Sequence, residues 1–344
     1  MYSFEQLMNP IWSSNIIYDE SLTMVKSNGI AEAPLLYTPQ EVLSVTSADK
    51  TIEYEQGKDW ELSGNMFKLT KNSRIFAFED NELIFDKVKP NKCFLTVDGK
   101  YSLFHEGHFF HDRQISITYK RMEGGCDFIV DSCDDMMPRM MEKLRNKKEL
   151  TIVLYGDSIA EGANSSGRAL TTPFLPTWGN LFVEKLRRHY NTKINLVNTS
   201  KGGKNSYWAI ENAKEKVADF HPDVAIIAFG MNDSDKAEKY VENIKKIMDI
   251  IIQTSPFTEF ILCATTVPNR KLKNFYKYQG EYRDALMKLR EKGTVIADFY
   301  SMQKYLLKRK RFIDLTGNNV NHPNDFMIRC HAQLLTELFI STRN

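Results

Sequence analysis

The chain has 344 residues, of which 42% are hydrophobic and 26% charged, and its formal net charge is +2. This composition is ordinary for a globular protein, and the length suffices for two domains that each bury a core. A charge so close to zero gives no reason to expect nucleic acid or an anionic membrane surface as a partner. Because no apolar run reaches the length of a membrane span, we expect no membrane partner either.

The cysteines are scattered and include no CxxC pair. An odd number of cysteines without metal-site spacing favours free thiols in a reducing compartment over a disulfide framework or a zinc site. The first residues have neither the basic nor the apolar stretch of a secretion signal. We therefore expect a cytoplasmic protein that needs no metal or organic cofactor. The cysteines are Cys93, Cys126, Cys133, Cys263 and Cys330.

The first third of the chain alternates short β-branched and aromatic segments with turn sequences rich in Gly, Asn and Pro. Such spacing is typical of a sandwich of antiparallel strands. The sequence therefore predicts an N-terminal β-sandwich domain of jelly-roll type. The predicted strands are 16–18, 42–45, 68–69, 75–78, 93–97 and 114–119.

Three histidines, His105, His108 and His111, follow one another at a spacing of three. This spacing suggests a metal site, but the surrounding residues are aromatic and typical of a loop. No helix here would place all three imidazoles on one face. We interpret them as polar loop residues, on a lobe that faces a second domain.

A connecting helix is predicted over 134–145, with acidic residues at its start and basic residues at its end. It places the boundary between domains 1–147 and 148–344. After the boundary, apolar runs typical of buried strands alternate with helical periodicity, which predicts a doubly wound parallel α/β sheet. The predicted strands are 152–155, 194–197, 224–229, 260–264 and 295–298, and the predicted helices are 178–189, 207–220, 237–253, 279–291, 302–308 and 326–340.

One serine stands where the first of these parallel strands ends. The strand stops at Gly156, and Asp157 and Ser158 follow at once. Because loops at the carboxyl ends of parallel strands carry the chemistry of such sheets, Ser158 is a candidate nucleophile. The alternative is an ordinary strand-to-helix turn in which Asp157 or Ser158 caps the helix.

Three later loops supply what a serine nucleophile needs for acyl transfer. His322, in the loop before the last helix, can accept the proton of Ser158 and return it to the leaving group. The negatively charged oxygen of the intermediate needs hydrogen-bond donors at about 3 Å. The backbone N–H of Ser158, that of Gly203 and the side-chain amide of Asn232 are the predicted oxyanion donors.

These motifs, in this order, resemble the four blocks of the GDSL or SGNH hydrolase family, over residues 149 to 344. The resemblance implies a serine hydrolase with Ser158 as nucleophile, Gly203 and Asn232 as oxyanion donors and His322 as base. The matching segments are Gly156-Asp157-Ser158-Ile159, Asn198 with Gly203 five residues later, Gly230-Met231-Asn232-Asp233 and His322-Pro323.

One position departs from that family. Members usually have Asp three residues before the base, where this chain has Asn319. An amide oxygen can accept the imidazole N–H but cannot stabilise the imidazolium by charge. His322 is then oriented by Asn319 or a backbone carbonyl, in an arrangement close to a Ser-His dyad, or by Asp325 or Asp314. Asp325 is alternatively the N-cap of the last helix.

A β-rich domain before such a hydrolase domain is similar to the two-domain acetyl xylan esterases of carbohydrate esterase family 2. This similarity implies an esterase that removes O-acetyl groups from sugars or oligosaccharides, with an acyl-enzyme intermediate. Aromatic side chains near the site, Trp178 and Trp208 with Tyr207 and Phe174, could stack on a sugar, or they could be core residues. The alternatives are a thioesterase or lysophospholipase of the same family, and a carbohydrate-binding protein whose hydrolase domain is inactive.

Overall fold

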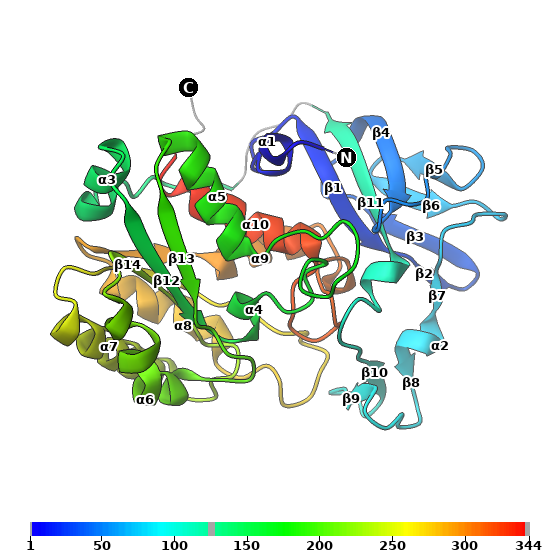
Figure 1. Cartoon of the computed structure of the whole chain (residues 1–344). Coiled ribbons are helices and arrows are strands. Elements are labelled where there is room, and N and C mark those ends of the chain that lie inside the picture. The colour runs from blue at the N-terminus through cyan, green and yellow to red at the C-terminus, as the bar shows by residue number, and fades with distance from the viewer. Residues whose placement is uncertain (1, 123–127, 341–344) are drawn as a thin grey trace.

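A β-rich domain and an α/β domain lie side by side in the structure, a computed structural model that describes residues 2–122 and 128–340 (Figure 1). The N-terminal part has two larger sheets. One is antiparallel, in the order β1-β11-β4, and the other has the order β5-β6-β3-β2-β7. Their strands are β1 (Ile16–Thr23), β2 (Val25–Ser27), β3 (Ile30–Pro34), β4 (Pro39–Ser47), β5 (Trp60–Ser63), β6 (Met66–Leu69), β7 (Phe78–Glu79) and β11 (Gln114–Arg121).

A small third sheet forms a lobe at the far end of this domain. It contains β8 (Ile84–Phe85), β9 (Cys93–Leu95) and β10 (Tyr101–Leu103), with β10 in the middle. Short helices α1 (Phe4–Leu7) and α2 (Asp80–Leu83) and the turn η1 (His111–Arg113) complete the domain. We call residues 84–107 the β8–β10 lobe.

The N-terminal prediction was right in class but incomplete in its strands. The expected strand at 75–78 is wrong over most of its length, because the preceding segment bends round a buried carboxylate. Asp59 accepts hydrogen bonds from the backbone N–H of Arg74 at 3.0 Å and from its guanidinium at 2.6 Å. The short strands β2, β3, β5, β8 and β10 were missed, since two to five residues carry too little periodicity to be recognised.

The C-terminal part is the predicted parallel sheet. Its strands pair in the order β13-β12-β14-β15-β16, all parallel. β13 is thus added on one side of β12, and the later strands are added on its other side. Ligands bind such sheets at the carboxyl ends of the strands where this order reverses, which here is beside β12. The strands are β12 (Leu150–Gly156), β13 (Ile194–Asn198), β14 (Val224–Ala228), β15 (Glu259–Cys263) and β16 (Thr294–Ala297).

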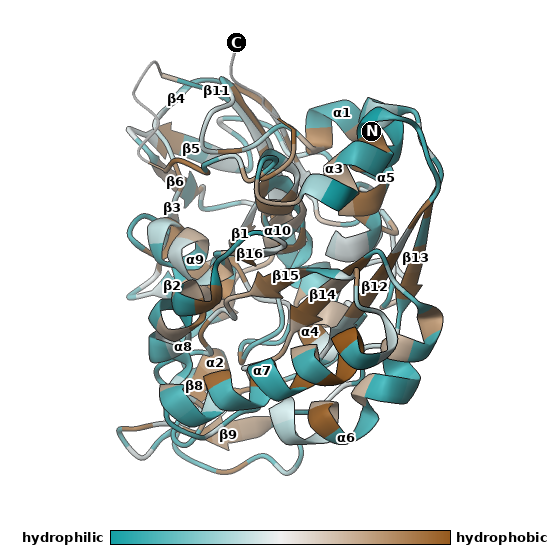
Figure 2. Ribbon diagram, turned by 90° about the vertical axis from the view of Figure 1, so that its left-hand side faces the viewer, coloured by the Kyte–Doolittle hydropathy of each residue, from teal (hydrophilic) through white to brown (hydrophobic). Residues whose placement is uncertain are grey.

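Helices cover both faces of this sheet, and its strands are buried between them (Figure 2). Along β12, Ile152 and Leu154 face one apolar cluster, while Val153 and Tyr155 face the other. The helices are α3 (Pro138–Arg145), α4 (Ser158–Glu161), α5 (Trp178–Tyr190), α6 (Ser206–Lys216), α7 (Ala237–Thr254), α8 (Gln279–Leu286), α9 (Phe299–Leu307) and α10 (Asp325–Glu337).

Capping moves several helix ends from their predicted positions. Helix α3 begins at Pro138, four residues late, where the carboxylate of Glu259 accepts the backbone N–H groups of Arg139 and Met140. Helix α9 begins early, because Asp298 caps it. The cap of α10 is Asn324, so the interpretation of Asp325 as N-cap was wrong.

The two parts share one continuous apolar core and a polar contact with no exposure to solvent. Lys310 pairs with Glu20 at 2.5 Å, and both side chains are completely buried. Asp314 accepts the backbone N–H of Thr23 at 2.9 Å and pairs with Arg311. Since the core runs through both parts, the expected boundary after residue 147 stays a prediction.

Two further expectations concern the cysteines and membrane-spanning helices. Cys93, Cys133, Cys263 and Cys330 are free thiols, and Cys126 lies outside the described residues. No helix within 2–122 and 128–340 is long and apolar enough to cross a membrane.

Candidate active site

The serine loop follows β12, and the last residue of this strand, Gly156, has no room for a side chain. A Cβ atom at Gly156 would collide with the carbonyl oxygen of Ala228 on β14 and with Ala160. Asp157 then caps α4, since its carboxylate accepts the N–H of Ile159 at 2.9 Å. The two interpretations of this turn are therefore compatible: Asp157 is the cap, and Ser158 is the first helical residue.

Ser158 and His322 meet at the carboxyl edge of the sheet. The Ser158 hydroxyl lies 2.8 Å from Nε2 of His322, and both residues are less than 10% exposed. The histidine loop is rigid because the side-chain oxygen of Asn318 accepts the backbone N–H groups of Val320, Asn321 and His322, at 2.9–3.0 Å. This is the hydrogen bond that links a serine nucleophile to its general base.

The other imidazole nitrogen contacts an asparagine. Oδ1 of Asn164 lies 2.7 Å from Nδ1 of His322. The amide nitrogen of Asn164 donates to the carbonyl oxygens of Gly107 and Gly317, at 2.8 and 3.3 Å, so the amide must present its oxygen to the imidazole. Nδ1 therefore carries the proton, and Nε2 is free to accept the proton of Ser158.

A carboxylate from the β8–β10 lobe reaches the same nitrogen. Oε2 of Glu106 lies 3.2 Å from Nδ1 of His322, and Oε1 accepts from the amide of Asn318 at 3.2 Å. The side chain of Glu106 is half-exposed. Its partial burial alone would raise its pKa, but hydrogen bonds from His322, Asn318 and Asn164 and the charge of His322 lower the pKa below its ordinary value. Glu106 is therefore ionised at neutral pH.

The residues that we expected to orient His322 lie elsewhere. The amide of Asn319 donates to Ser102 Oγ and Leu103 O, at 3.1 and 2.9 Å. Asp325 accepts the backbone N–H of Ser166 at 2.8 Å. Asp314 is used in the contact between domains. None of the three is a partner of His322 within the described residues, and Asn164 and Glu106 occupy the position instead.

The loop with Gly203 is fixed against the serine turn. The amide of Asn198 donates to Ala160 O at 2.9 Å, and the N–H of Gly202 donates to the carboxylate of Glu161 at 2.9 Å. A Cβ atom on Gly202 would lie 3.7 Å from that of Ser158, so this loop borders the nucleophile. Within 2–122 and 128–340, the N–H groups of Ser158 and Gly203 have no hydrogen-bond partner, which leaves both free to donate to a substrate.

Asn232 lies beside the Gly203 loop. One N–H of its amide donates to the carbonyl oxygen of Lys204 at 2.9 Å, which turns the NH₂ group toward that loop, and the second N–H has no partner among the residues that the structure describes. The neighbouring Asp233 holds the start of α6, accepting the N–H of Ser206 at 3.1 Å. Burial outweighs this bond and raises the pKa of Asp233 above its ordinary value.

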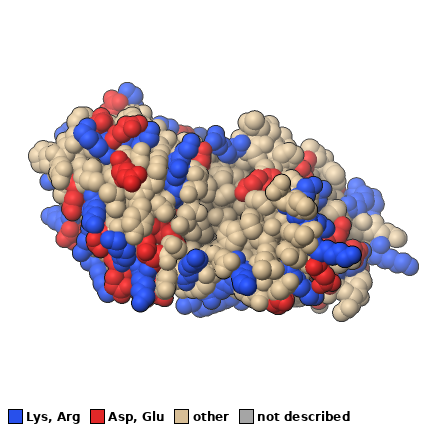
Figure 3. All heavy atoms as spheres, turned by 90° about the horizontal axis from the view of Figure 1, so that it is seen from below, with Lys and Arg blue, Asp and Glu red and all other residues tan. Residues whose placement is uncertain are grey.

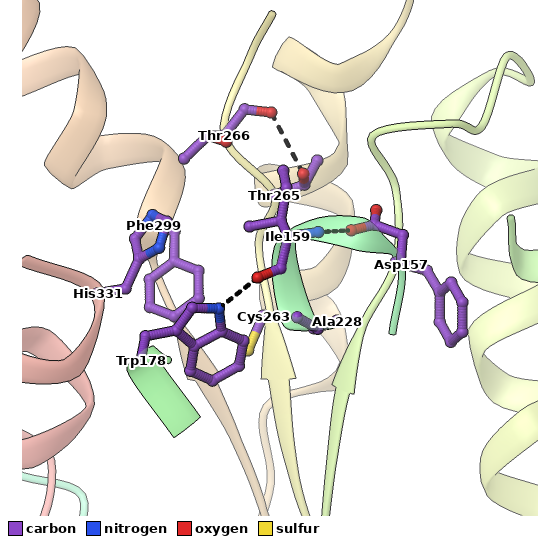
Figure 4. Close-up of a pocket in the computed structure, with 11 residues that line it drawn as sticks. Asp157, Ile159, Trp178, Ala228, Cys263, Thr265, Thr266, Phe299 and His331 are labelled. Carbon is purple, nitrogen blue, oxygen red and sulfur yellow. Dashed lines mark hydrogen bonds between the residues drawn. The ribbon is translucent and has the colours of Figure 1, made fainter. Parts of the chain in front are cut away.

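Trp178 does not face a substrate, and its assignment as a sugar-stacking residue was wrong. It is completely buried, and its indole N–H donates to Ile159 O at 2.8 Å (Figure 4). Its ring packs edge-on against Phe299 and His331 beneath the serine turn. Burial lowers the pKa of His331 to about 3, so this imidazole is neutral.

The other aromatic candidates are more accessible. Trp208 is half-buried at the start of α6, where it packs on Tyr155 and lies under the ammonium group of Lys204. Tyr207 is exposed beside it. Phe174 is exposed as well, on a cavity of about 1020 Å³ between the two domains whose lining does not include Ser158.

The three histidines of the N-terminal domain point to separate partners. His105 stacks on Phe109, His108 contacts the carboxylate of Asp112 at 2.6 Å, and His111 contacts Thr172 O at 2.7 Å. The last contact confirms that this stretch faces the second domain. Across the described ranges, no three His, Cys, Asp or Glu side chains are grouped so that they could hold a metal ion.

A serine bonded to a histidine at the carboxyl edge of a parallel sheet, beside unused N–H donors, defines a serine acylhydrolase. The family model of GDSL-like lipases and acylhydrolases matches residues 154–326, and the chain belongs to this family. The match includes Ser158, Gly203, Asn232 and His322. Glu106 lies outside it, in the N-terminal domain.

Solved structures share the fold. A two-domain esterase named CEX, active on acetylated mannans, aligns at 19% identity with a TM-score of 0.50, over 62% of this chain and 55% of that one. An acetylxylan esterase from Geobacillus stearothermophilus, Axe2, aligns at 17% identity with a TM-score of 0.44, over 55% and 92%. At such identities the likeness extends to the fold alone. A comparison with curated proteins found no match.

Proposed function

We propose that the protein is a serine esterase that removes acetyl groups from carbohydrates through an acyl-enzyme. The proposal depends on the 2.8 Å contact between Ser158 Oγ and His322 Nε2, in the tautomer that Asn164 enforces. In this tautomer Nε2 has its lone pair toward the hydroxyl. A serine that is hydrogen-bonded to a neutral imidazole can be deprotonated as it attacks a carbonyl carbon.

In the first half of the reaction, Ser158 Oγ attacks the ester carbonyl and His322 Nε2 takes the hydroxyl proton. The carbonyl oxygen becomes an anion, which accepts hydrogen bonds from the N–H groups of Ser158 and Gly203 and from the amide of Asn232. Each such donor contributes about 3 kcal/mol to lowering the barrier. His322 then gives the proton to the departing sugar hydroxyl.

In the second half, a water molecule takes the place of the sugar alcohol. His322 removes a proton from the water as it attacks the acetyl-serine, and the same donors stabilise the second anion. The intermediate collapses to acetate, and Ser158 recovers its proton from His322. All atoms that move in these steps belong to the protein chain, the ester or water.

The protein interior beneath the serine turn is closely packed. Trp178, Phe299 and His331 fill the interior beneath it and leave a cavity of about 10 Å³, which is room for about one water molecule. A long acyl chain could not enter on that side. Seen from below, the surface between the two domains is hollowed and mostly uncharged (Figure 3). Such a surface suits a neutral carbohydrate.

The CEX esterase gives this proposal its substrate class, because its name states activity on acetylated mannans. Trp208 and Tyr207, at the start of α6, are the side chains that we assign to the sugar. An aromatic face can stack on the C–H groups of a sugar ring. These two assignments are part of the proposal.

The test is acetate release from acetylated mannan and xylan oligosaccharides by the wild type and by Ser158→Ala. We expect release by the wild type alone. Ser13→Ala is the control, since Ser13 is an exposed serine in the N-terminal domain. Equal release by Ser158→Ala would refute the assignment of the nucleophile.

Acyl chain length separates the related activities. A series of 4-nitrophenyl esters should show the highest kcat/KM for acetyl and a steep loss for longer chains. A preference for long chains would replace the sugar esterase by a thioesterase or lysophospholipase. Sugar binding without turnover, and without covalent labelling of Ser158 by a fluorophosphonate, would indicate an inactive hydrolase domain.

A further inference from the structure

The asparagine that fixes the tautomer of His322 leaves a charge unbalanced during catalysis. When Nε2 accepts the proton of Ser158, the imidazole becomes a cation. The neutral amide of Asn164 accepts the Nδ1–H but carries no charge to offset that cation. The usual family position for the acid, Asn319, is turned away from the site. The compensating charge must therefore come from another part of the chain.

Two carboxylates interact with the imidazole. Asp157, in the serine turn, is completely buried, and this burial raises its pKa to about 7, so it is only partly ionised at neutral pH. Glu106, from the β8–β10 lobe, is ionised and lies 3.2 Å from Nδ1. Asp325 interacts instead with His111, Ser166 and Arg329. Glu106 is thus the anion with direct contact to the base.

The backbone on both sides of Glu106 is fastened to the α/β domain. On one side, Asn319 donates to Leu103 O at 2.9 Å. On the other, Asn164 donates to Gly107 O at 2.8 Å. The loop that carries Glu106 is therefore held by Asn319, at the family's acid position, and by Asn164, which orients His322.

The rest of the lobe is attached by main-chain bonds. The N–H of Val97 donates to Lys271 O at 2.9 Å, and the N–H of Lys273 donates to Leu95 O at 2.8 Å. Phe94 packs edge-on against Phe275 beside these bonds. A segment of the α/β domain thereby pairs with the end of β9 and with the residues that follow it. This pairing fixes the position of the lobe and of the Glu106 carboxylate.

We propose that Glu106 is the positioning and charge-balancing residue of the catalytic histidine, so that the N-terminal domain completes the active site. The inference rests on the proposed ester hydrolysis. The proton of Ser158 moves to Nε2 and later to the leaving group, while Nδ1 keeps its own proton. Glu106 stays ionised throughout and takes part in no covalent step. Asn164 selects the tautomer, and Glu106 supplies the negative charge.

The experiment compares Glu106→Gln with the wild type in hydrolysis of 4-nitrophenyl acetate. The amide has the size of the carboxylate, so Glu106→Gln should fold with an unchanged melting temperature. We expect kcat to fall about tenfold with KM preserved, since the charge acts mainly in the transition state. The acidic limb of the pH–rate profile should move to lower pH, because removing an anion favours the neutral imidazole.

Asp86→Asn is the matched control. It removes one negative charge from the same lobe, where Asp86 is exposed and pairs loosely with Lys100 at 3.9 Å. Its kcat and pH profile should equal those of the wild type. A general effect of lobe charge would change both variants alike and would contradict the inference.

The outcomes separate this inference from the proposed function. If the wild type hydrolyses the ester and Glu106→Gln matches it at every pH, Glu106 has no role in the reaction, although the esterase assignment stands. If the wild type neither hydrolyses esters nor reacts with a fluorophosphonate at Ser158, the esterase assignment itself is wrong. Glu106→Asp should recover part of the lost kcat, which a purely structural role of the long side chain would not allow.

Discussion

Asn164 Oδ1 accepts a hydrogen bond from His322 Nδ1 at 2.7 Å, while the same amide donates to two backbone carbonyls. The amide therefore has one possible orientation, and the imidazole has one favoured tautomer. This relationship decides how Ser158 can be activated. It also joins three segments, since the two carbonyls belong to the β8–β10 lobe and to the histidine loop.

Replacing Asn164 with alanine should reduce catalysis strongly. The tautomer of His322 is then selected only by the longer contact with Glu106, at 3.2 Å, and a wrong tautomer alone costs several orders of magnitude in triad enzymes. We expect kcat on 4-nitrophenyl acetate to fall about 100-fold or more. Glu106 can still accept from Nδ1, so the loss should stay smaller than in Ser158→Ala. The control is Asn180→Ala, an exposed asparagine on α5; equal kcat in Asn164→Ala and the wild type would contradict the assigned role.

Restoring the acid at the family position should not help this protein. In Asn319→Asp, the new carboxylate cannot donate to Leu103 O, and this buried acceptor loses the hydrogen bond, whereas the hydroxyl of Ser102 can turn and donate to the carboxylate. Buried groups left without a partner cost about 1–3 kcal/mol each. We expect a lower free energy of unfolding in urea and no gain in kcat. A variant that is more active and equally stable would show that residue 319 faces His322.

The sequence was sufficient for the catalytic pair because both residues lie in loops next to strand or helix ends. Ser158 lies two residues after Gly156, at the end of β12, and His322 lies three residues before the first residue of α10. Parallel strands bring such loops to one edge whatever the details of packing. Periodicity also placed the five parallel strands and most helices along the chain, whereas the order of the strands in the sheet became known from the structure.

The partners of His322 could not be predicted, because they depend on how separate segments pack. Glu106 is 216 residues away in the chain and belongs to another domain, and Asn164 follows a short helix with a positive φ of 63°. A signal was present for Glu106: a polar stretch within an aromatic loop, which we expected to face the second domain. Trp178 was misassigned because an indole near a site and an indole beneath it have the same sequence signature.

The stability of the protein should decrease between about pH 4 and pH 7 because of Asp157. Burial raises the pKa of Asp157 to about 7, whereas that of the unfolded chain is near 4. As the pH rises, the unfolded state therefore releases the proton first, and folding loses free energy until the folded carboxyl also ionises. The loss in this window should be up to about 4 kcal/mol.

Asp157→Asn isolates this contribution. Its side-chain oxygen can still accept the N–H of Ile159, so α4 keeps its cap. We expect the difference in free energy of unfolding between the variant and the wild type to change across pH 4 to 7 in favour of the variant, as measured in urea. Parallel pH curves for the two proteins would show that Asp157 ionises normally.

The buried pair between the domains should be costly to break. Lys310→Met leaves the carboxylate of Glu20 buried with two partners, the N–H of Leu36 and the hydroxyl of Tyr119. Removing one member of such a pair destabilises proteins by about 3–5 kcal/mol. The exposed pair of Lys26 with Glu79 is the control, and Lys26→Met should cost less than about 1 kcal/mol. Similar melting temperatures for the two variants would contradict the complete burial of Lys310.

The most direct measurement is the site of acylation. The protein is mixed with 4-nitrophenyl acetate, quenched in acid within the first turnover, digested and analysed by mass spectrometry. An acetyl group should be found on the peptide that carries Ser158, and it should be absent in Ser158→Ala and strongly reduced in His322→Ala. Acetate production without acetylation of Ser158, or acetylation that persists undiminished in His322→Ala, would contradict a serine nucleophile activated by that histidine.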